Sequence, residues 1–255
     1  MMFAFRRWPG PAFKMAAGVI FLCMITASCR KMEGEGGTGS ISGIIMEHFY
    51  NDDYSLFIYT KPAVDEEVFI LYGEEEVLGD RLFTGPTGAF RFGFLYPGRY
   101  TVYYQSQDST ALLDEDVEML TVVTLDRGEE ADLGELVKLT TLDFDDGAAM
   151  IRGVVKVIDY VDSSRWPNLV VDYIDYAYEQ EVYLTYGNHT FYDERIRTQY
   201  DGSFKFSRLI PGDYLIFLYS EDVTRVKDKL VLKYEVTITE MDQVVDLGEI
   251  TIEER

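Results

Sequence analysis

The stretch that decides the fold is TQYDGSFKFSRLIPGDYLIF, residues 198–217, because the chain contains a second version of it. Residues 84–103 read TGPTGAFRFGFLYPGRYTVY and share Thr, Gly, two alternating Phe, Leu, Pro-Gly and Tyr at a constant offset of 114 residues. The repeat extends to both sides, since EVFILYG at 67–73 matches EVYLTYG at 181–187, and ADLGELV at 131–137 matches VDLGEIT at 245–251. The chain is therefore predicted to contain two copies of one domain of about 100 residues, an ordinary domain size.

Each copy has the two-residue periodicity of β-strands. Phe204 and Phe206 alternate with polar residues, and Tyr, Phe, Val, Ile and Thr dominate the strand-like segments. Asp-Gly at 201–202 predicts a two-residue type I′ hairpin turn, and Pro-Gly at 211–212 predicts a type II turn. No helix is expected after residue 29. About seven short strands per copy favour an all-β fold of two tandem antiparallel β-sandwich domains.

The repeated phrase T-x-x-D-G-x-F-x-F-x-x-L-x-P-G-x-Y resembles the signature of carboxypeptidase regulatory-like domains, a transthyretin-like (prealbumin-like) β-sandwich family. In the second copy it falls on Thr198, Asp201, Gly202, Phe204, Phe206, Leu209, Pro211, Gly212 and Tyr214. The first copy departs from it by placing Thr87 where Asp is usual. The resemblance covers nearly all of residues 41–252 and implies the fold, but it says little about function because such domains accompany many activities. The Phe, Leu and Tyr positions are predicted to fill the core.

The N-terminus has the pattern of an export signal. Basic residues precede an apolar run at 15–27 that is too short to span a bilayer, and small residues then lead into Cys29. ITASC resembles the lipobox of bacterial lipoproteins, whose cysteine becomes acylated. The alternative is an ordinary signal peptide cut near Ser28, which would leave an unpaired thiol, since Cys23 lies in the discarded segment. The lipoprotein interpretation predicts an anchor on Cys29 in the outer membrane, facing the cell surface or the periplasm.

These patterns divide the chain into five predicted segments. Residues 1–28 form the signal peptide, and residues 29–40 form the acylated cysteine with a Gly-rich flexible tether. The first sandwich covers residues 41–140, an acidic linker covers 141–148, and the second sandwich covers 149–255.

The charge of the chain argues against one class of partner. The formal net charge is −22, and removal of residues 1–28 would leave 20 Lys and Arg against 45 Asp and Glu, a net charge of −25. Such a surface repels nucleic acid, whose binding requires neutralised phosphates. It also repels anionic headgroups, so membrane contact is expected through the lipid anchor alone.

No catalytic motif stands out, and we expect a non-enzymatic protein without a cofactor other than the covalent lipid. The two histidines, His48 between the first and second strands and His189 in a loop, have no second histidine or cysteine at ligand spacing. Asp143, Asp145 and Asp146 in the linker are a weak candidate for a Ca²⁺ site, although Gly147 breaks the EF-hand order. A solvated acidic linker is the favoured alternative.

The second copy carries an aromatic insertion with Trp166, Tyr173, Tyr176 and Tyr178. Such rings can stack on sugars or anchor a protein partner, or they can cover the open end of the sandwich. The expected function is a non-catalytic, lipid-anchored envelope protein that acts as a tethered scaffold or protein-binding module. The alternative is a carbohydrate-binding surface lipoprotein accessory to glycan uptake.

Overall fold

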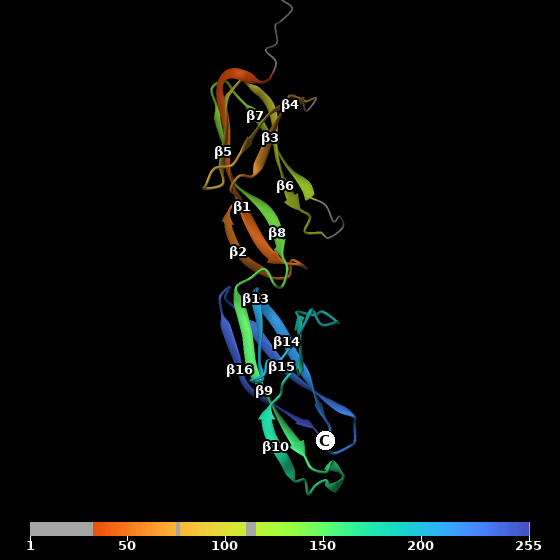
Figure 1. Ribbon diagram of the computed structural model, residues 1–255. Coiled ribbons are helices and arrows are strands. Elements are labelled where there is room, and N and C mark those ends of the chain that lie inside the picture. Colours follow the sequence, from red (N-terminus) through yellow and green to blue (C-terminus); the bar gives the residue numbers. More distant parts are fainter. Residues whose placement is uncertain (1–32, 75–76, 111–115, 255) are drawn as a thin grey trace, which may run out of the picture.

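The chain forms two β-sandwiches arranged end to end, one for each sequence copy (Figure 1). A computed structural model describes residues 33–74, 77–110 and 116–254. The first sandwich comprises β1(Glu35–Asn51), β2(Phe57–Pro62), β3(Glu67–Tyr72), β4(Val77–Phe83), β5(Ala89–Leu95), β6(Gly98–Gln107), β7(Asp116–Leu125) and β8(Glu130–Leu142). The second comprises β9(Ala149–Tyr160), the 3₁₀ turn η1(Ser163–Arg165), β10(Val171–Tyr176), β11(Glu181–Tyr186), β12(Glu194–Arg197), β13(Ser203–Leu209), β14(Gly212–Glu221), β15(Lys229–Ile238) and β16(Val244–Glu254). The prediction of an all-β chain with two tandem sandwiches is confirmed, with eight strands in each copy.

Each sandwich packs two four-stranded sheets against each other. In the first, the long strand β1 pairs with β8 along one edge and with β5 and β2 in succession along the other, while the second sheet runs β4-β3-β6-β7. The second sandwich repeats this with β9 between β16 and the pair β13 and β10, opposite the sheet β12-β11-β14-β15. The first and last strands of each copy, β1 with β8 and β9 with β16, run parallel, and the other paired strands run antiparallel as expected.

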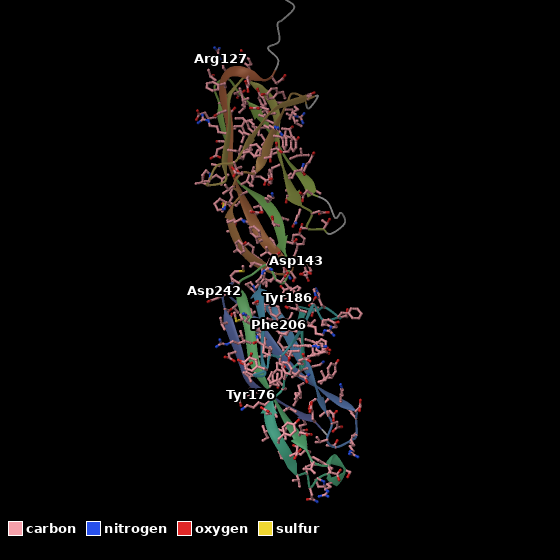
Figure 2. The ribbon with its side chains drawn as sticks, in the orientation of Figure 1. Arg127, Asp143, Tyr176, Tyr186, Phe206 and Asp242 are labelled. Atoms are coloured by element: carbon pink, nitrogen blue, oxygen red, sulfur yellow. The ribbon has the colours of Figure 1, made fainter. Side chains whose placement is uncertain are left out.

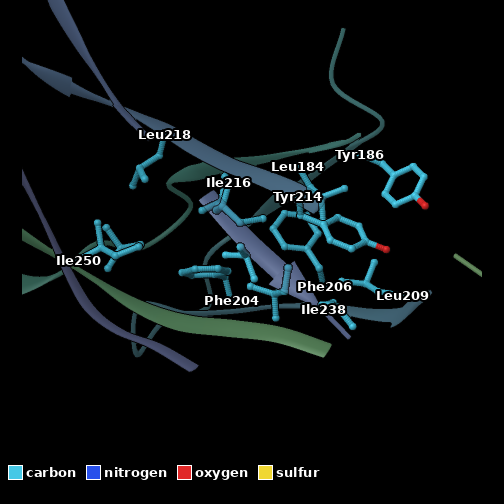
Figure 3. Packing of buried hydrophobic residues seen from close by; sticks show 14 of the residues in the cluster. Leu184, Tyr186, Phe204, Phe206, Leu209, Tyr214, Ile216, Leu218, Ile238 and Ile250 are labelled. Atoms are coloured by element: carbon cyan, nitrogen blue, oxygen red, sulfur yellow. The ribbon is translucent and has the colours of Figure 1, made fainter. Parts of the chain in front are cut away.

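The repeated signature fills the core, as predicted. Phe204, Phe206, Leu209 and Tyr214 are all at most 3% exposed and lie between the two sheets of the second sandwich (Figure 3). Their counterparts in the first sandwich are buried to the same degree. Apolar side chains at alternate positions of two facing sheets bury each other. The sequence signature recurs because both sandwiches need the same side chains to fill this space.

The glycine in the first strand of each copy belongs to the same packing unit. A Cβ on Gly153 would lie 2.8 Å from ring atoms of Phe204, and a Cβ on Gly43 would lie 2.9 Å from those of Phe90. A real side chain does not fit at these distances, so the glycine provides the space that the ring occupies. The glycine of the I-x-G segment and the first phenylalanine of the F-x-F strand therefore pack directly against each other.

Two buried hydroxyl groups explain the polar letters of the signature. The Thr198 hydroxyl accepts the backbone N–H of Gln180 at 2.9 Å and donates to the carbonyl of Ala177, and Thr84 does the same in the first copy. The Tyr214 hydroxyl donates to the carbonyl of Ile210 at 2.7 Å. These bonds satisfy buried backbone groups in the loops between strands, which would otherwise be costly to desolvate.

The turn at Asp201 and Gly202 differs from the predicted two-residue type I′ turn. Gly202 has a φ of 71°, whereas Asp201 keeps a negative φ. The Gly202 N–H donates to the Gln199 carbonyl, and the Gln199 N–H donates to the Ser203 carbonyl, both at 2.9 Å. The loop therefore holds three residues, and only the last one needs the left-handed conformation that glycine tolerates.

The predicted tether ends earlier than expected, because β1 begins at Glu35 and residues 35–40 belong to this strand. Gly37 is required there for close approach, since a Cβ would lie 2.0 Å from the carbonyl oxygen of Leu95. The Gly34 carbonyl accepts the N–H of Tyr96 at 2.9 Å. The glycines that indicated flexibility thus fit a tightly packed entry turn.

The linker between the copies is the matching entry turn of the second sandwich. Gly147, 110 residues after Gly37, has the same constraint, with a Cβ position 1.9 Å from the carbonyl oxygen of Leu209. The Phe144 carbonyl accepts the N–H of Ile210 at 3.1 Å, and its side chain packs against the second core. The acidic side chains of this segment remain partly exposed to solvent, while its backbone and Phe144 are docked on the second sandwich.

Candidate functional site

The predicted aromatic residues lie on and beside the β9–β10 hairpin. This hairpin extends away from the junction, and Tyr176, at the end of β10, lies about midway along the second sandwich (Figures 1 and 2). Trp166, Tyr173, Tyr176 and Tyr178 are 46–66% exposed, so they do not bury the open end of the sandwich. β10 pairs with β9 in unbroken register from Tyr173 to Tyr176, which places these two rings on opposite faces of the strand. The hairpin therefore offers exposed rings but no single row of them.

The acidic linker does not assemble a calcium site. Arg208 faces it, with guanidinium nitrogens 4.0 Å from a carboxylate oxygen of Asp145 and 3.7 Å from one of Asp146. The carboxylate of Asp146 also accepts the N–H of Asp143 at 3.1 Å. Among the described residues, no group of three or more His, Cys, Asp or Glu side chains could hold a metal ion. The arginine thus stands where the prediction put a cation.

The two histidines differ from their predicted settings. His48 lies within β1 rather than after it, and its ring makes an edge contact with Phe57. His189 is not an isolated loop residue: its Nδ1 lies 2.7 Å from Asp193 and its Nε2 lies 3.4 Å from Asp52 of the first sandwich. The hydrogen bond with Asp193, followed by the charges of both carboxylates, raises the His189 pKa above its usual value. This residue bridges the two copies.

A groove of about 660 Å³ surrounds this bridge at the junction of the two sandwiches. Its walls come from the β1–β2 hairpin on one side and from the ends of β11, β14 and β15 on the other. Tyr186 lies buried at this end of the second core, and burial raises its pKa to about 12 (Figure 2). Asp52, Asp53 and Asp213 line the groove beside His189 and apolar side chains. The groove is formed where the two sandwiches meet. Among the described residues, no three of its carboxylate and imidazole groups come close enough together to hold a metal ion.

A further surface is an aromatic cluster that the sequence did not single out. Four rings, from Tyr183, Tyr192, Phe217 and Tyr219, lie on the outer side of the sheet β12-β11-β14-β15; we call this surface the aromatic face. Tyr183 and Phe217 stack across β11 and β14, with centroids 4.9 Å apart and planes 8° apart. Tyr192 and Tyr219 meet Tyr183 edge-on at 5.2 and 5.9 Å and stay 50% and 37% exposed.

Polar groups adjoin these rings on the same side of the sheet. The Tyr183 hydroxyl donates to Glu181 Oε2 at 2.5 Å, while Arg195 and Arg197 donate to Glu181 Oε1 at 3.2 and 3.5 Å. The tyrosine hydrogen bond is the main cause that lowers the Glu181 pKa, and the two guanidinium charges add to it. The same bond raises the Tyr183 pKa. Glu181 is thus an ionised acceptor, held in place between three donors.

A comparison of the two copies is the sequence signal that could have found this surface. The stacked pair recurs in the first sandwich, where Phe69 and Tyr103 lie 4.7 Å apart. The two exposed rings do not recur: Leu78 and Gln105 occupy the positions of Tyr192 and Tyr219. Aromatic residues are equally common in the cores, so their number alone does not separate a surface cluster from packing.

Comparisons with known proteins give one family match and several distant structural likenesses. A model of the calcineurin-like phosphoesterase family matches residues 130–253, just under half of the chain, and no curated protein matches significantly. The minor pilin GBS52 of Streptococcus agalactiae is 11% identical, with 85% of this chain and 96% of that chain covered and a TM-score of 0.29. The shaft pilin SpaA of Lactobacillus rhamnosus GG is 5% identical, with 85% and 98% covered and a TM-score of 0.24.

A third likeness is to the TIE protein of Bacillus anthracis, at 12% identity and a TM-score of 0.26, with 84% of this chain covered. This chain spans only 35% of the length of that protein. Identities and TM-scores this low support no inference about function.

The residues present do not fit the metal centre that a calcineurin-like phosphoesterase would imply. Phosphatases of this kind use two metal ions about 3.5–4 Å apart, which requires several converging ligands. Residues 130–253 contain a single histidine, His189, and no cysteine. Both nitrogens of that histidine face carboxylates at the junction, and the described residues contain no group of three potential ligands.

Proposed function

We propose that the chain is a non-catalytic, lipid-anchored protein of the cell envelope, in which two carboxypeptidase regulatory-like sandwiches form a tethered binding module. Cys29, directly after small residues, would carry the lipid, and residues 30–34 would connect it to β1. Among the described residues, no helix is long and apolar enough to cross a membrane. The outer membrane is the proposed location, with the acidic sandwiches held away from anionic headgroups by charge repulsion.

The proposed binding role rests on the aromatic face. Clustered tyrosine rings that stay partly exposed are common where a ligand covers them. Here three of the rings stand on a four-stranded sheet whose other side is the domain core, and Tyr192, in the loop before β12, packs edge-on against Tyr183. The surface is therefore formed before any ligand arrives. A preformed surface of this kind suits binding, because little conformational entropy is lost on association.

A second candidate function, carbohydrate binding in support of glycan uptake, is favoured by the same face. Aromatic rings next to a carboxylate and two guanidinium groups supply the stacking surfaces and hydrogen-bonding groups that sugars need. A surface that binds another protein typically has a more apolar centre surrounded by a polar rim. The polar groups here lie within the ring cluster itself.

Membrane fractionation tests the anchor. Cys29→Ala should abolish lipid labelling and release the protein into the soluble fraction after a high-salt wash. Cys23→Ala is the matched control, since that residue lies within the segment expected to be removed, and it should leave labelling unchanged. Membrane association of Cys29→Ala after the wash would contradict the lipoprotein assignment.

A phosphatase assay tests the non-catalytic part of the proposal against the family match. The purified chain is expected to hydrolyse p-nitrophenyl phosphate no faster than buffer in the presence of Mn²⁺. Metal-dependent turnover that disappears in His189→Ala would identify a phosphoesterase and overturn the proposal.

A further inference from the structure

We infer that the aromatic face is a binding site for an uncharged polysaccharide, with Tyr192 and Tyr219 as the rings that contact the sugars. This inference rests on the proposed binding function and names its ligand.

The four rings divide into two with a structural role and two without one. Tyr183 and Phe217 cover each other's faces in the cross-strand stack, so they support the surface rather than offer ring faces to a ligand. Tyr192 and Tyr219 adjoin this support at 66° and 84° to Tyr183 and remain the more exposed rings of the four. The stack thus fixes two exposed tyrosines on a rigid base.

The difference between the copies argues that the exposed rings are not needed for folding. The first sandwich keeps the stack but has Leu78 and Gln105 where the second has Tyr192 and Tyr219. Both copies have the same sheet order and comparable cores, although only the second copy has the two exposed rings. The added tyrosines therefore serve a property that belongs to the second sandwich alone.

The polar groups beside the rings match hydroxyl groups. A sugar hydroxyl both donates and accepts, so it is best recognised where fixed donors and acceptors lie together. Glu181 supplies carboxylate lone pairs, and the half-exposed guanidinium groups of Arg195 and Arg197 supply N–H donors. Because these three groups already hold one another, they present their remaining hydrogen-bonding capacity in a defined direction.

The charge of the face favours a neutral ligand. On this side of the sheet stand four positive groups and five negative groups: Arg195, Arg197, Lys229 and Lys233, with Glu179, Glu181, Asp213, Glu221 and Glu235. The face is therefore close to balanced, while the chain as a whole carries −22. A polyanion would be repelled by the surrounding field, and a polycation would be drawn to the more acidic surfaces elsewhere on the molecule.

Affinity electrophoresis of the full exported chain, in gels that contain a soluble polysaccharide, tests this inference. The probes are three uncharged polymers, hydroxyethyl cellulose, galactomannan and dextran, and one charged polymer, polygalacturonate. At least one uncharged polymer should retard the protein, and polygalacturonate should not. Tyr192→Ala and Tyr219→Ala should each weaken the retardation at least about tenfold, which corresponds to about 1.4 kcal/mol of binding free energy.

Tyr200→Ala is the matched control, because Tyr200 is an 82% exposed tyrosine in a turn outside the aromatic face; it should bind as the parent does. Circular dichroism melts of all variants check that the fold is kept. The inference is overturned if no uncharged polymer binds, if polygalacturonate alone binds, or if Trp166→Ala removes binding that Tyr192→Ala and Tyr219→Ala retain. None of these outcomes affects the lipid labelling of Cys29, which reports separately on the proposed envelope function.

Discussion

At the scale of single residues, the Phe, Thr and Tyr of the repeated signature and the first-strand Gly each have a physical task in or beside the core. The two Phe residues of the strand face inward, the Thr and Tyr hydroxyls satisfy backbone groups in the loops, and the first-strand Gly leaves room for a ring. The same set is satisfied in both sandwiches, which explains its recurrence without any appeal to a shared ligand.

Burial predicts opposite outcomes for two large aromatic residues. Phe204→Ala should lower the free energy of unfolding by about 3–5 kcal/mol, because it leaves a cavity in a fully packed core. Trp166→Ala should change it by less than about 0.5 kcal/mol, since the ring is half-exposed at the hairpin end. Urea melts measure both. A mild effect of Phe204→Ala would contradict its inward placement, and a severe effect of Trp166→Ala would mean that this ring packs against the sandwich.

Two glycines of the first sandwich should respond differently to the same change. Gly37→Ala should destabilise the chain by about 1–3 kcal/mol, because the new methyl group meets the backbone carbonyl of Leu95, which has no freedom to move aside. Gly93→Ala is the control: nothing lies within 4 Å of its Cβ position, and the substitution should stabilise by about 0.4–1 kcal/mol through the unfolded chain. Equal effects in denaturant melts would contradict the close approach at Gly37.

At the scale of secondary-structure elements, the entry turn defines where each domain begins. In the first sandwich the Gly34 N–H donates to the hydroxyl of Tyr100 at 3.2 Å, and the Gly34 carbonyl accepts from Tyr96. In the second, Phe144 occupies the same place, 110 residues later. The entry turns at Gly34 and Phe144 therefore pack with the sandwich that follows each of them, ahead of the boundaries at 41 and 149 expected from the sequence.

Fragments of the chain test these units. Residues 33–142 and 143–254, expressed separately, should each melt cooperatively with β-type circular dichroism, because each has its own buried core. The shorter fragment 41–142 should unfold at lower urea concentration than 33–142, since it lacks the entry turn and the first six residues of β1. If both longer fragments are unfolded while the full chain melts cooperatively, the two sandwiches form one folding unit.

At the scale of the whole molecule, His189 reports on the contact between the sandwiches. Its pKa is raised first by the hydrogen bond with Asp193 and then by the charges of Asp193 and Asp52. A raised folded pKa means that the protonated histidine stabilises the fold fully below its unfolded pKa of about 6.5, and that this contribution is lost as the pH rises through the folded value.

An NMR titration can follow this residue directly, because the chain has only two histidines and His48 supplies a second signal for reference. The His189 pKa should lie above the usual value, fall most in Asp193→Asn, and fall by a smaller amount in Asp52→Asn. The last variant is the decisive one, because Asp52 belongs to the first sandwich. An unchanged His189 pKa in Asp52→Asn would mean that the two sandwiches do not keep this contact in solution.

The sequence by itself determined the all-β class, the two copies, and the residues that fill each core. These follow from local rules, since a strand places alternate residues on one face and the repeat marks which face is buried. The position of the entry turns was not decided at that level, because a glycine for flexibility and a glycine for close packing are the same letter. Only the contact of Gly37 with Leu95 separates them.

The aromatic face and the junction were decided by tertiary structure alone. Tyr183 lies on β11, Phe217 and Tyr219 lie on β14, and Tyr192 lies in the loop before β12, so their approach depends on how β11, β12 and β14 pair. His189 meets Asp52 across 137 residues of sequence, through the placement of one sandwich against the other. Such sites join groups that are distant in sequence, so the periodicity that reveals a core carries no information about them.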